Sequence, residues 1–75
     1  MKIRKVDIEH VPLDAAKIRA LRLKLGLSQA EAARLAGMAG RSHWNRIEKG
    51  YTDPTLGTIE RIAAALGVRA KDLLK

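Results

Sequence analysis

The chain has 75 residues, of which 47% are hydrophobic but only 3% aromatic, and it contains no cysteine. A chain this short forms one domain with one modest core and leaves little room for a catalytic module, and the absence of cysteine excludes disulfide bonds and thiolate metal sites. The 15 Lys and Arg residues against 8 acidic residues give a formal net charge of +7, which favours polyanionic partners such as nucleic acid.

The start of the chain alternates loosely between charged and β-branched residues and shows neither a strand nor a helix period. We interpret residues 1–13 as an extended N-terminal arm before a domain that spans residues 14–75. The basic side chains of the arm are Lys2, Arg4 and Lys5. We expect them either to follow a DNA backbone or enter a minor groove, or to belong to a solvated tail. An arm of this length can also pair with a partner protein.

The first helix is predicted over about Ala15 to Leu25, because Asp14 is typical of an N-cap and Gly26 of a C′ glycine. Its apolar residues at helical spacing form one stripe that we expect to face the core. This stripe consists of Ile18, Leu21 and Leu25.

The second helix is predicted over about Gln29 to Ala36, because Ser28 and Glu31 have the spacing of a capping box. Gly37 and Gly40 then bracket a short turn in which glycine can take a positive φ. The third helix is expected over about Arg41 to Lys49 and is closed by Gly50. The second helix is expected to pack closely through two small residues, Ala30 and Ala33.

A fourth helix is predicted to follow the N-cap Thr55 and to end near Gly67. The residues expected on its buried stripe are Leu56, Ile59, Ile62, Ala63 and Leu66. One or two further helical turns are expected over residues 70–74. The pattern therefore predicts an all-α fold, a compact bundle of about five short helices.

The second and third helices, joined by a glycine-containing turn, have the layout of a helix-turn-helix unit. Residue identity adds to this layout in the runs LRLKLGLSQ (residues 21–29), IEKG (47–50) and AALGV (64–68), together with Ala33, Gly37 and Pro54. Over about residues 14 to 74 the chain closely resembles the Cro and phage lambda repressor-like helix-turn-helix family. The resemblance implies five helices, with the second and third as the DNA-binding pair.

The resemblance also implies roles for individual residues. Gln29 is expected to contact a DNA phosphate, and Arg22 and Glu48 are expected to form a buried ion pair between the first and third helices. Two positions depart from the family pattern, since Trp44 replaces a smaller aliphatic residue and Ala32 replaces a common Leu. These two changes can compensate each other in volume.

A further departure concerns register, because the chain holds one residue more than the common pattern between Gly37 and Glu48. Matching the family's base-contacting positions backward from Glu48 selects Arg41, Ser42 and Arg46. Matching them forward from Gly37 selects Gly40, Arg41 and Asn45. Only Arg41 is selected by both.

Helical geometry gives an independent view of the third helix, at about 100° per residue. With Trp44 directed into the core, Ile47 and Glu48 lie on the same side, and the polar residues lie opposite. The predicted base-contacting residues are Arg41, Ser42, Asn45 and Arg46. The predicted phosphate-contacting residues are Gln29, His43, Lys49 and Thr52.

Other site classes have no support in the sequence. His10 and His43 are too few and too far apart for a metal centre, and no Ser, His and carboxylate set has a nucleophile context. We therefore expect no catalytic residue, metal or cofactor. No apolar run approaches the roughly 20 residues of a membrane span, and no signal-like stretch follows the basic start, so a cytoplasmic protein without membrane contact is expected.

The function predicted is a sequence-specific regulator of double-stranded DNA, most simply a repressor. A homodimer is expected, with recognition helices in major grooves about 34 Å apart and an interface near residues 68–74, where two adjacent leucines are difficult to bury in one small bundle. One alternative is an antitoxin or mobile-element accessory protein that mainly binds another protein. The other is a DNA binder with little sequence preference.

Overall fold

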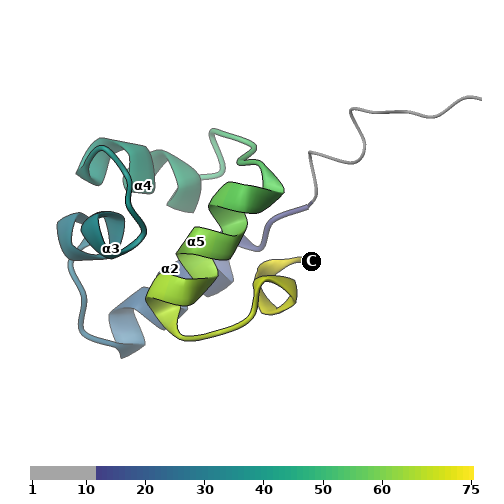
Figure 1. Cartoon of the computed structure of the whole chain (residues 1–75), viewed down its shortest axis with the longest axis horizontal. Helices are drawn as coiled ribbons and strands as arrows, with labels where there is room; N and C mark the ends of the chain where they lie inside the picture. Colours follow the sequence, from purple (N-terminus) through teal and green to yellow (C-terminus); the bar gives the residue numbers. More distant parts are fainter. Residues whose placement is uncertain (1–11) are drawn as a thin grey trace, which may run out of the picture.

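The computed structural model describes residues 12–75, which form four α-helices and one 3-10 turn (Figure 1). The elements are α2 (Ala15–Lys24), α3 (Gln29–Leu35), α4 (Arg41–Glu48), α5 (Leu56–Leu66) and η1 (Ala70–Leu73). The all-α prediction is confirmed, and the ends of the first three helices fall within one residue of their predicted positions. The fifth element is a single 3-10 turn rather than an α-helix.

The helix starts are fixed by the predicted caps. The Asp14 carboxylate accepts a hydrogen bond from the Lys17 N–H at 3.1 Å. Ser28 and Glu31 form both bonds of the capping box, at 3.0 and 2.8 Å, and the Thr55 hydroxyl caps α5. Each cap satisfies a backbone N–H that has no partner inside its helix.

The turn between α3 and α4 has a positive φ at one of its two glycines, as predicted. Gly37 has a φ of 71°, a left-handed conformation that favours glycine. Gly40 has a φ of 175° and is the N-cap of α4. Its backbone is extended, so this position makes no demand for glycine, and the turn requires a positive φ only once.

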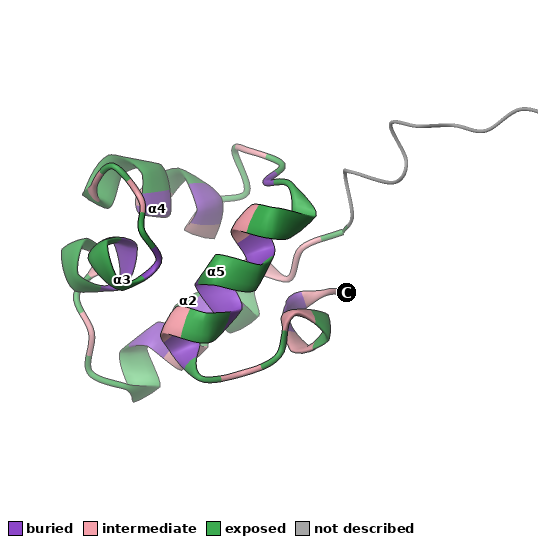
Figure 2. Ribbon diagram, in the orientation of Figure 1, coloured by how far each residue is buried: buried purple, intermediate pink, exposed green. Residues whose placement is uncertain are grey.

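The core lies where α5 packs against α2, α3 and η1, and where α4 packs against α2 and α3. Helices α4 and α5 are buried on one side and exposed on the other (Figure 2). The six largest fully buried side chains are Trp44, Ile18, Ile47, Ile59, Ile62 and Leu73. Trp44 is thus a core residue, as predicted, and Ala32 on α3 is fully buried as well.

Three residues predicted to pack inward are instead exposed. Leu25 is the C-cap residue of α2 and is 52% exposed, and Leu56 is the first residue of α5 and is 43% exposed. Both stand at helix ends, where the stripe runs past the packed part of the bundle. Ala30 is also exposed, because α3 packs through the face that carries Ala32, Ala33 and Ala36.

The chain entering α2 is tied to the end of the described chain. Leu13 and Leu74 form an isolated antiparallel bridge, with hydrogen bonds from the Asp14 N–H to the Leu73 carbonyl at 2.8 Å and from the Lys75 N–H to the Pro12 carbonyl at 3.2 Å. Leu73 is fully buried within the single chain. Leu74 is partly buried against the core, so the single chain accommodates both adjacent leucines, and the premise that they are difficult to bury in one small bundle is corrected.

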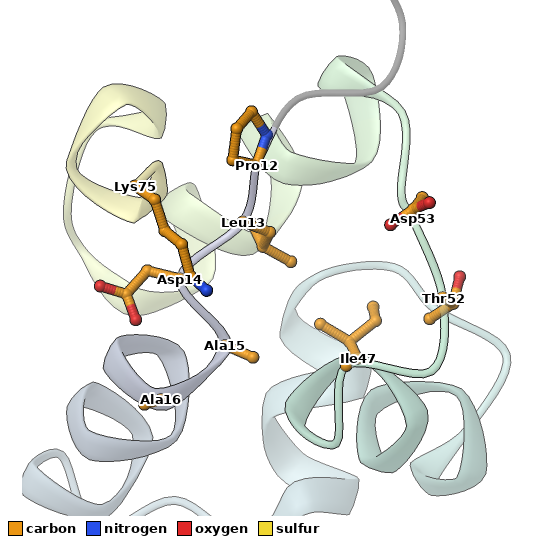
Figure 3. Close-up of a pocket in the computed structure, with 10 residues that line it drawn as sticks. Pro12, Leu13, Asp14, Ala15, Ala16, Ile47, Thr52, Asp53 and Lys75 are labelled. Atoms are coloured by element: carbon orange, nitrogen blue, oxygen red, sulfur yellow. The ribbon is translucent and has the colours of Figure 1, made fainter.

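A hollow lies beside this bridge, between the segment that enters α2 and the segment that leaves α4 (Figure 3). Pro12 to Ala16 and Lys75 line one side, and Ile47, Thr52 and Asp53 line the other. The arm residues Lys2, Arg4 and Lys5 lie outside the described residues. Across residues 12–75, no helix has both the length and the apolar character required to cross a membrane.

Candidate nucleic-acid interface

Helix α4 presents a polar outer face because its apolar residues point inward. Trp44 and Ile47 are fully buried, whereas Arg41, Ser42 and Arg46 are exposed. The structure therefore confirms the predicted division of this helix into an apolar face and a polar face. The helix begins at Arg41, and its last residue, Glu48, is paired with Arg22.

The start of α3 and the outer face of α4 together form a shallow hollow. We call it the α3–α4 hollow, and its lining residues are Gln29, Arg41, Ser42, Asn45 and Arg46. It contains every residue predicted to contact bases, and one of those predicted to contact phosphate. A second hollow beside it shares Arg41, Ser42 and Arg46 and adds His43.

Two predicted phosphate contacts lie elsewhere. Lys49 is exposed at the C-cap of α4 and lines neither of these hollows. Thr52 is partly buried and lines the hollow of Figure 3 with Asp53 and Lys75. The structure therefore brings together the predicted base contacts with Gln29 and His43, and leaves Lys49 and Thr52 beyond the end of α4.

Behind the polar face, the buried ion pair expected from the resemblance is present. Arg22 donates to Glu48 twice, from Nε to Oε2 at 2.6 Å and from Nη2 to Oε1 at 3.1 Å, and from Nη1 to the Leu27 carbonyl at 2.9 Å. The two side chains are only 9% and 3% exposed. This bidentate pair joins α2 to α4 and sets the position of the helix that carries the polar face.

Glu48 accepts two further hydrogen bonds that were not predicted from the sequence. One comes from the indole N–H of Trp44, and the other from Gln29 Nε2 at 3.1 Å. The bond from Trp44 had a signal in the sequence, because residues four apart share a helix face and a buried indole N–H requires an acceptor. The bond from Gln29 joins residues 19 positions apart and had none.

The charges in this network are stabilised by their partners. Burial raises the pKa of the Glu48 carboxyl, but hydrogen bonds from Arg22, Trp44 and Gln29 outweigh that effect and hold the pKa below its usual value. The hydrogen bond to Glu48 likewise raises the pKa of the Arg22 guanidinium despite its burial. Glu48 is therefore ionised at neutral pH and acts only as an acceptor.

The network continues to the surface through Gln29, which accepts a hydrogen bond at Oε1 from Asn45 Nδ2 at 3.3 Å. Two predicted DNA contacts are thus bonded to each other. Within residues 12–75 every buried side-chain nitrogen or oxygen has a hydrogen-bond partner. In the same part of the chain, no three His, Cys, Asp or Glu residues gather as a metal site.

Comparison with known proteins gives a consistent result. A family model described as a helix-turn-helix domain matches residues 15–74. The restriction-modification controller protein C.AhdI from Aeromonas hydrophila is 33% identical, with a TM-score of 0.76 over 80% of this chain and 89% of that one. No curated protein matches the sequence significantly.

Two further matches involve SinR. In its complex with DNA, SinR is described as the master regulator for biofilm formation. It is 30% identical with a TM-score of 0.71, over 79% of this chain and 94% of that one. The SinR protein/SinI protein complex matches at 31% identity and a TM-score of 0.75, over 84% of this chain and 61% of that one.

Proposed function

Since this chain belongs to the Cro and phage lambda repressor-like helix-turn-helix family, we propose that it is a transcriptional regulator that reads specific sequences in double-stranded DNA. Helix α4 enters the major groove, and the start of α3 lies across the backbone. The observation that carries this proposal is the α3–α4 hollow, where Gln29 meets the exposed polar residues of α4. The net charge of +7 supplies the attraction to DNA.

The residues of the α3–α4 hollow divide by chemistry. Arg41 and Arg46 each have a planar guanidinium that can donate two hydrogen bonds to O6 and N7 of guanine, and Ser42 and Asn45 complete the reading surface. Contacts to phosphate orient the protein without specifying sequence. These contacts are assigned to Gln29 in the α3–α4 hollow and His43 in the hollow beside it, and to Lys49 and Thr52, which follow α4 in the chain.

The protein acts as a homodimeric repressor in this proposal. One domain of this size contacts too few base pairs for high specificity, so two copies place their α4 helices in successive major grooves about 34 Å apart. A dimer bound in this way excludes other proteins from the same stretch of DNA, and this exclusion represses transcription.

The test is selection from a random double-stranded DNA pool by the pure protein at near-physiological salt, followed by sequencing of the retained DNA. We expect an inverted repeat with half-sites about one helical turn apart, because salt suppresses nonspecific attraction. Guanines in each half-site would support the arginine assignments. Binding without enrichment would overturn sequence reading in favour of a charge-driven binder, and the absence of binding would overturn the DNA-binding role.

A second candidate function is the capture of another protein, as an antitoxin or mobile-element accessory protein. The observation that favours it is the match to the SinR protein/SinI protein complex, in which a chain of similar fold is held with another protein. Purification of the protein from its own cells tests this candidate. A stoichiometric protein partner would support it, and a homodimer alone would count against it.

A further inference from the structure

The hydrogen bonds that run from Glu48 through Gln29 to Asn45 connect the buried ion pair to the α3–α4 hollow. We propose that Glu48, acting through Gln29, fixes the orientation of the Asn45 side-chain amide so that Asn45 reads adenine. This inference rests on the proposed function and adds a base identity to one position of the reading surface. Gln29 is a positioning residue in this scheme, in addition to its proposed contact with phosphate.

The direction of this relay follows from the charge at its buried end. An ionised carboxylate only accepts hydrogen bonds, so Gln29 must direct its NH2 group to Glu48, and the Nε2 to Oε1 distance is 3.1 Å. The Oε1 atom of Gln29 then faces away from Glu48 and accepts from Asn45 Nδ2 at 3.3 Å. With Gln29 reversed, its oxygen would meet the carboxylate oxygen, and no proton would lie between two acceptors.

The same logic fixes what Asn45 presents to a ligand. One N–H of its amide is used by Gln29, whereas Oδ1 and the second N–H have no partner within residues 12–75. Adenine shows an N6 donor beside an N7 acceptor in the major groove, which matches one amide oxygen and one amide N–H. Guanine shows two acceptors there, so its O6 would face Oδ1 without a proton between them.

The neighbours of Asn45 make this acceptor distinctive. Arg41 and Arg46 line the same hollow and provide only donors, which suit guanine. Asn45 Oδ1 is the amide acceptor that the relay directs away from α3. The reading surface should therefore require one adenine per half-site, next to the guanines assigned to the arginines. With two of its amide atoms engaged, Gln29 keeps one side-chain N–H for a phosphate.

The experiment begins with the selected DNA site and measures affinity by fluorescence anisotropy for each adenine in turn. We expect one adenine per half-site at which replacement by guanine weakens binding by about fivefold to 150-fold. Replacement of that adenine by 7-deazaadenine, which lacks the N7 acceptor, should also weaken binding. Asn45→Ala, which suits a helix and leaves the core intact, should abolish the preference at this position and keep the guanine preferences.

The relay itself is tested with Gln29→Met, a substitution of similar size that cannot hydrogen bond to Glu48 or Asn45. This substitution removes both roles of Gln29, and the two losses have different signatures. Loss of the phosphate contact should weaken binding to all DNA sequences equally. Loss of the relay should in addition reduce the preference for adenine over guanine at the Asn45 position, by about fivefold or more. In an Asn45→Ala background this position-specific effect should vanish. The control is Glu60→Gln on the exposed part of α5, which should keep the wild-type base profile.

Two results would overturn the relay while leaving the proposed function standing. One is a selected site in which no adenine responds to Asn45→Ala. The other is a Gln29→Met protein, folded by circular dichroism, that keeps the full adenine preference. Failure to select any site would instead overturn the proposed function, and the relay with it.

Discussion

Arginine occurs in two opposite environments in this small domain. Arg22 is 8% exposed and held by two hydrogen bonds to Glu48 and one to a backbone carbonyl. Arg41 and Arg46 are exposed on α4 and form no ion pair within residues 12–75. The buried arginine has its donors satisfied by the fold, whereas the exposed arginines keep their donors available for a ligand.

This difference separates stability from recognition within the same small group of helices. Removal of one partner of a buried ion pair leaves the other charge unpaired and with little access to water, which lowers the free energy of unfolding substantially. Removal of an exposed side chain leaves its surroundings solvated, which costs the fold little. Glu48 is where the two regions meet, because it binds Arg22 on one side and Gln29 on the other.

The largest expected effect is that of Arg22→Met. The substitution keeps the aliphatic stem but leaves the Glu48 carboxylate, whose side chain is 3% exposed, without its cationic partner. We expect the free energy of unfolding to fall by about 3 to 5 kcal/mol, measured by urea denaturation followed by circular dichroism. The matched control is Arg61→Met on α5, where the side chain is exposed and a change within about 0.5 kcal/mol is expected. Equal effects of the two substitutions would contradict the comparison.

Acidification weakens the same buried region without a mutation. The pKa of Glu48 is lowered in the folded protein from a usual value near 4.5, so its contribution to stability is complete above that pH and is lost as pH falls through the folded-state pKa. The difference in unfolding free energy between wild type and Glu48→Gln should therefore shrink below about pH 4.5. Glu31 also has a lowered pKa, but it is present in both proteins and cancels. A difference that is constant with pH would contradict the assignment.

The elements of the fold were predictable because their signals are local. The N-caps Asp14, Ser28 and Thr55 each act on an N–H three residues away, and the glycines that end helices adjoin them in sequence. Trp44 was also predictable as core, because it shares an apolar stripe with Ile47 at helical spacing while the polar residues lie opposite. The residues that line the α3–α4 hollow were predictable for a similar reason, because helical spacing and the short turn between α3 and α4 determine which side chains meet.

What the sequence did not reveal depends on contacts between distant segments. Leu25 and Leu56 fit their helical stripes, but only the assembled bundle shows that the stripes extend past the packed region. The bridge between Leu13 and Leu74 and the bond from Gln29 to Glu48 join residues without any local pattern. Hydrogen-bond direction within the α3–α4 hollow could therefore be assigned only after the fold was known.

Arg46→Ala tests the exposed side of the comparison, with a smaller expected effect that falls on DNA binding alone. Arg46 has no ion-pair partner within residues 12–75, so the unfolding free energy should stay within about 0.5 kcal/mol of wild type. The preference at one guanine should weaken by about 1 to 3 kcal/mol, measured by anisotropy titrations on single-base variants of the selected site. Equal weakening on every sequence would show instead that Arg46 contacts phosphate.

Lys49→Ala is expected to have the smallest effect, and it distinguishes a phosphate contact from a contribution to net charge. Lys49 is exposed at the C-cap of α4, so its loss should weaken binding equally on all DNA sequences. The slope of log affinity against log salt concentration should become shallower by about 0.9 for each lost phosphate contact. Lys71→Ala on η1 removes the same charge from an exposed residue outside helices α3 and α4 and should change the slope less. Equal slopes for the two variants would show that Lys49 acts only through the overall charge, and that the contact surface ends with α4.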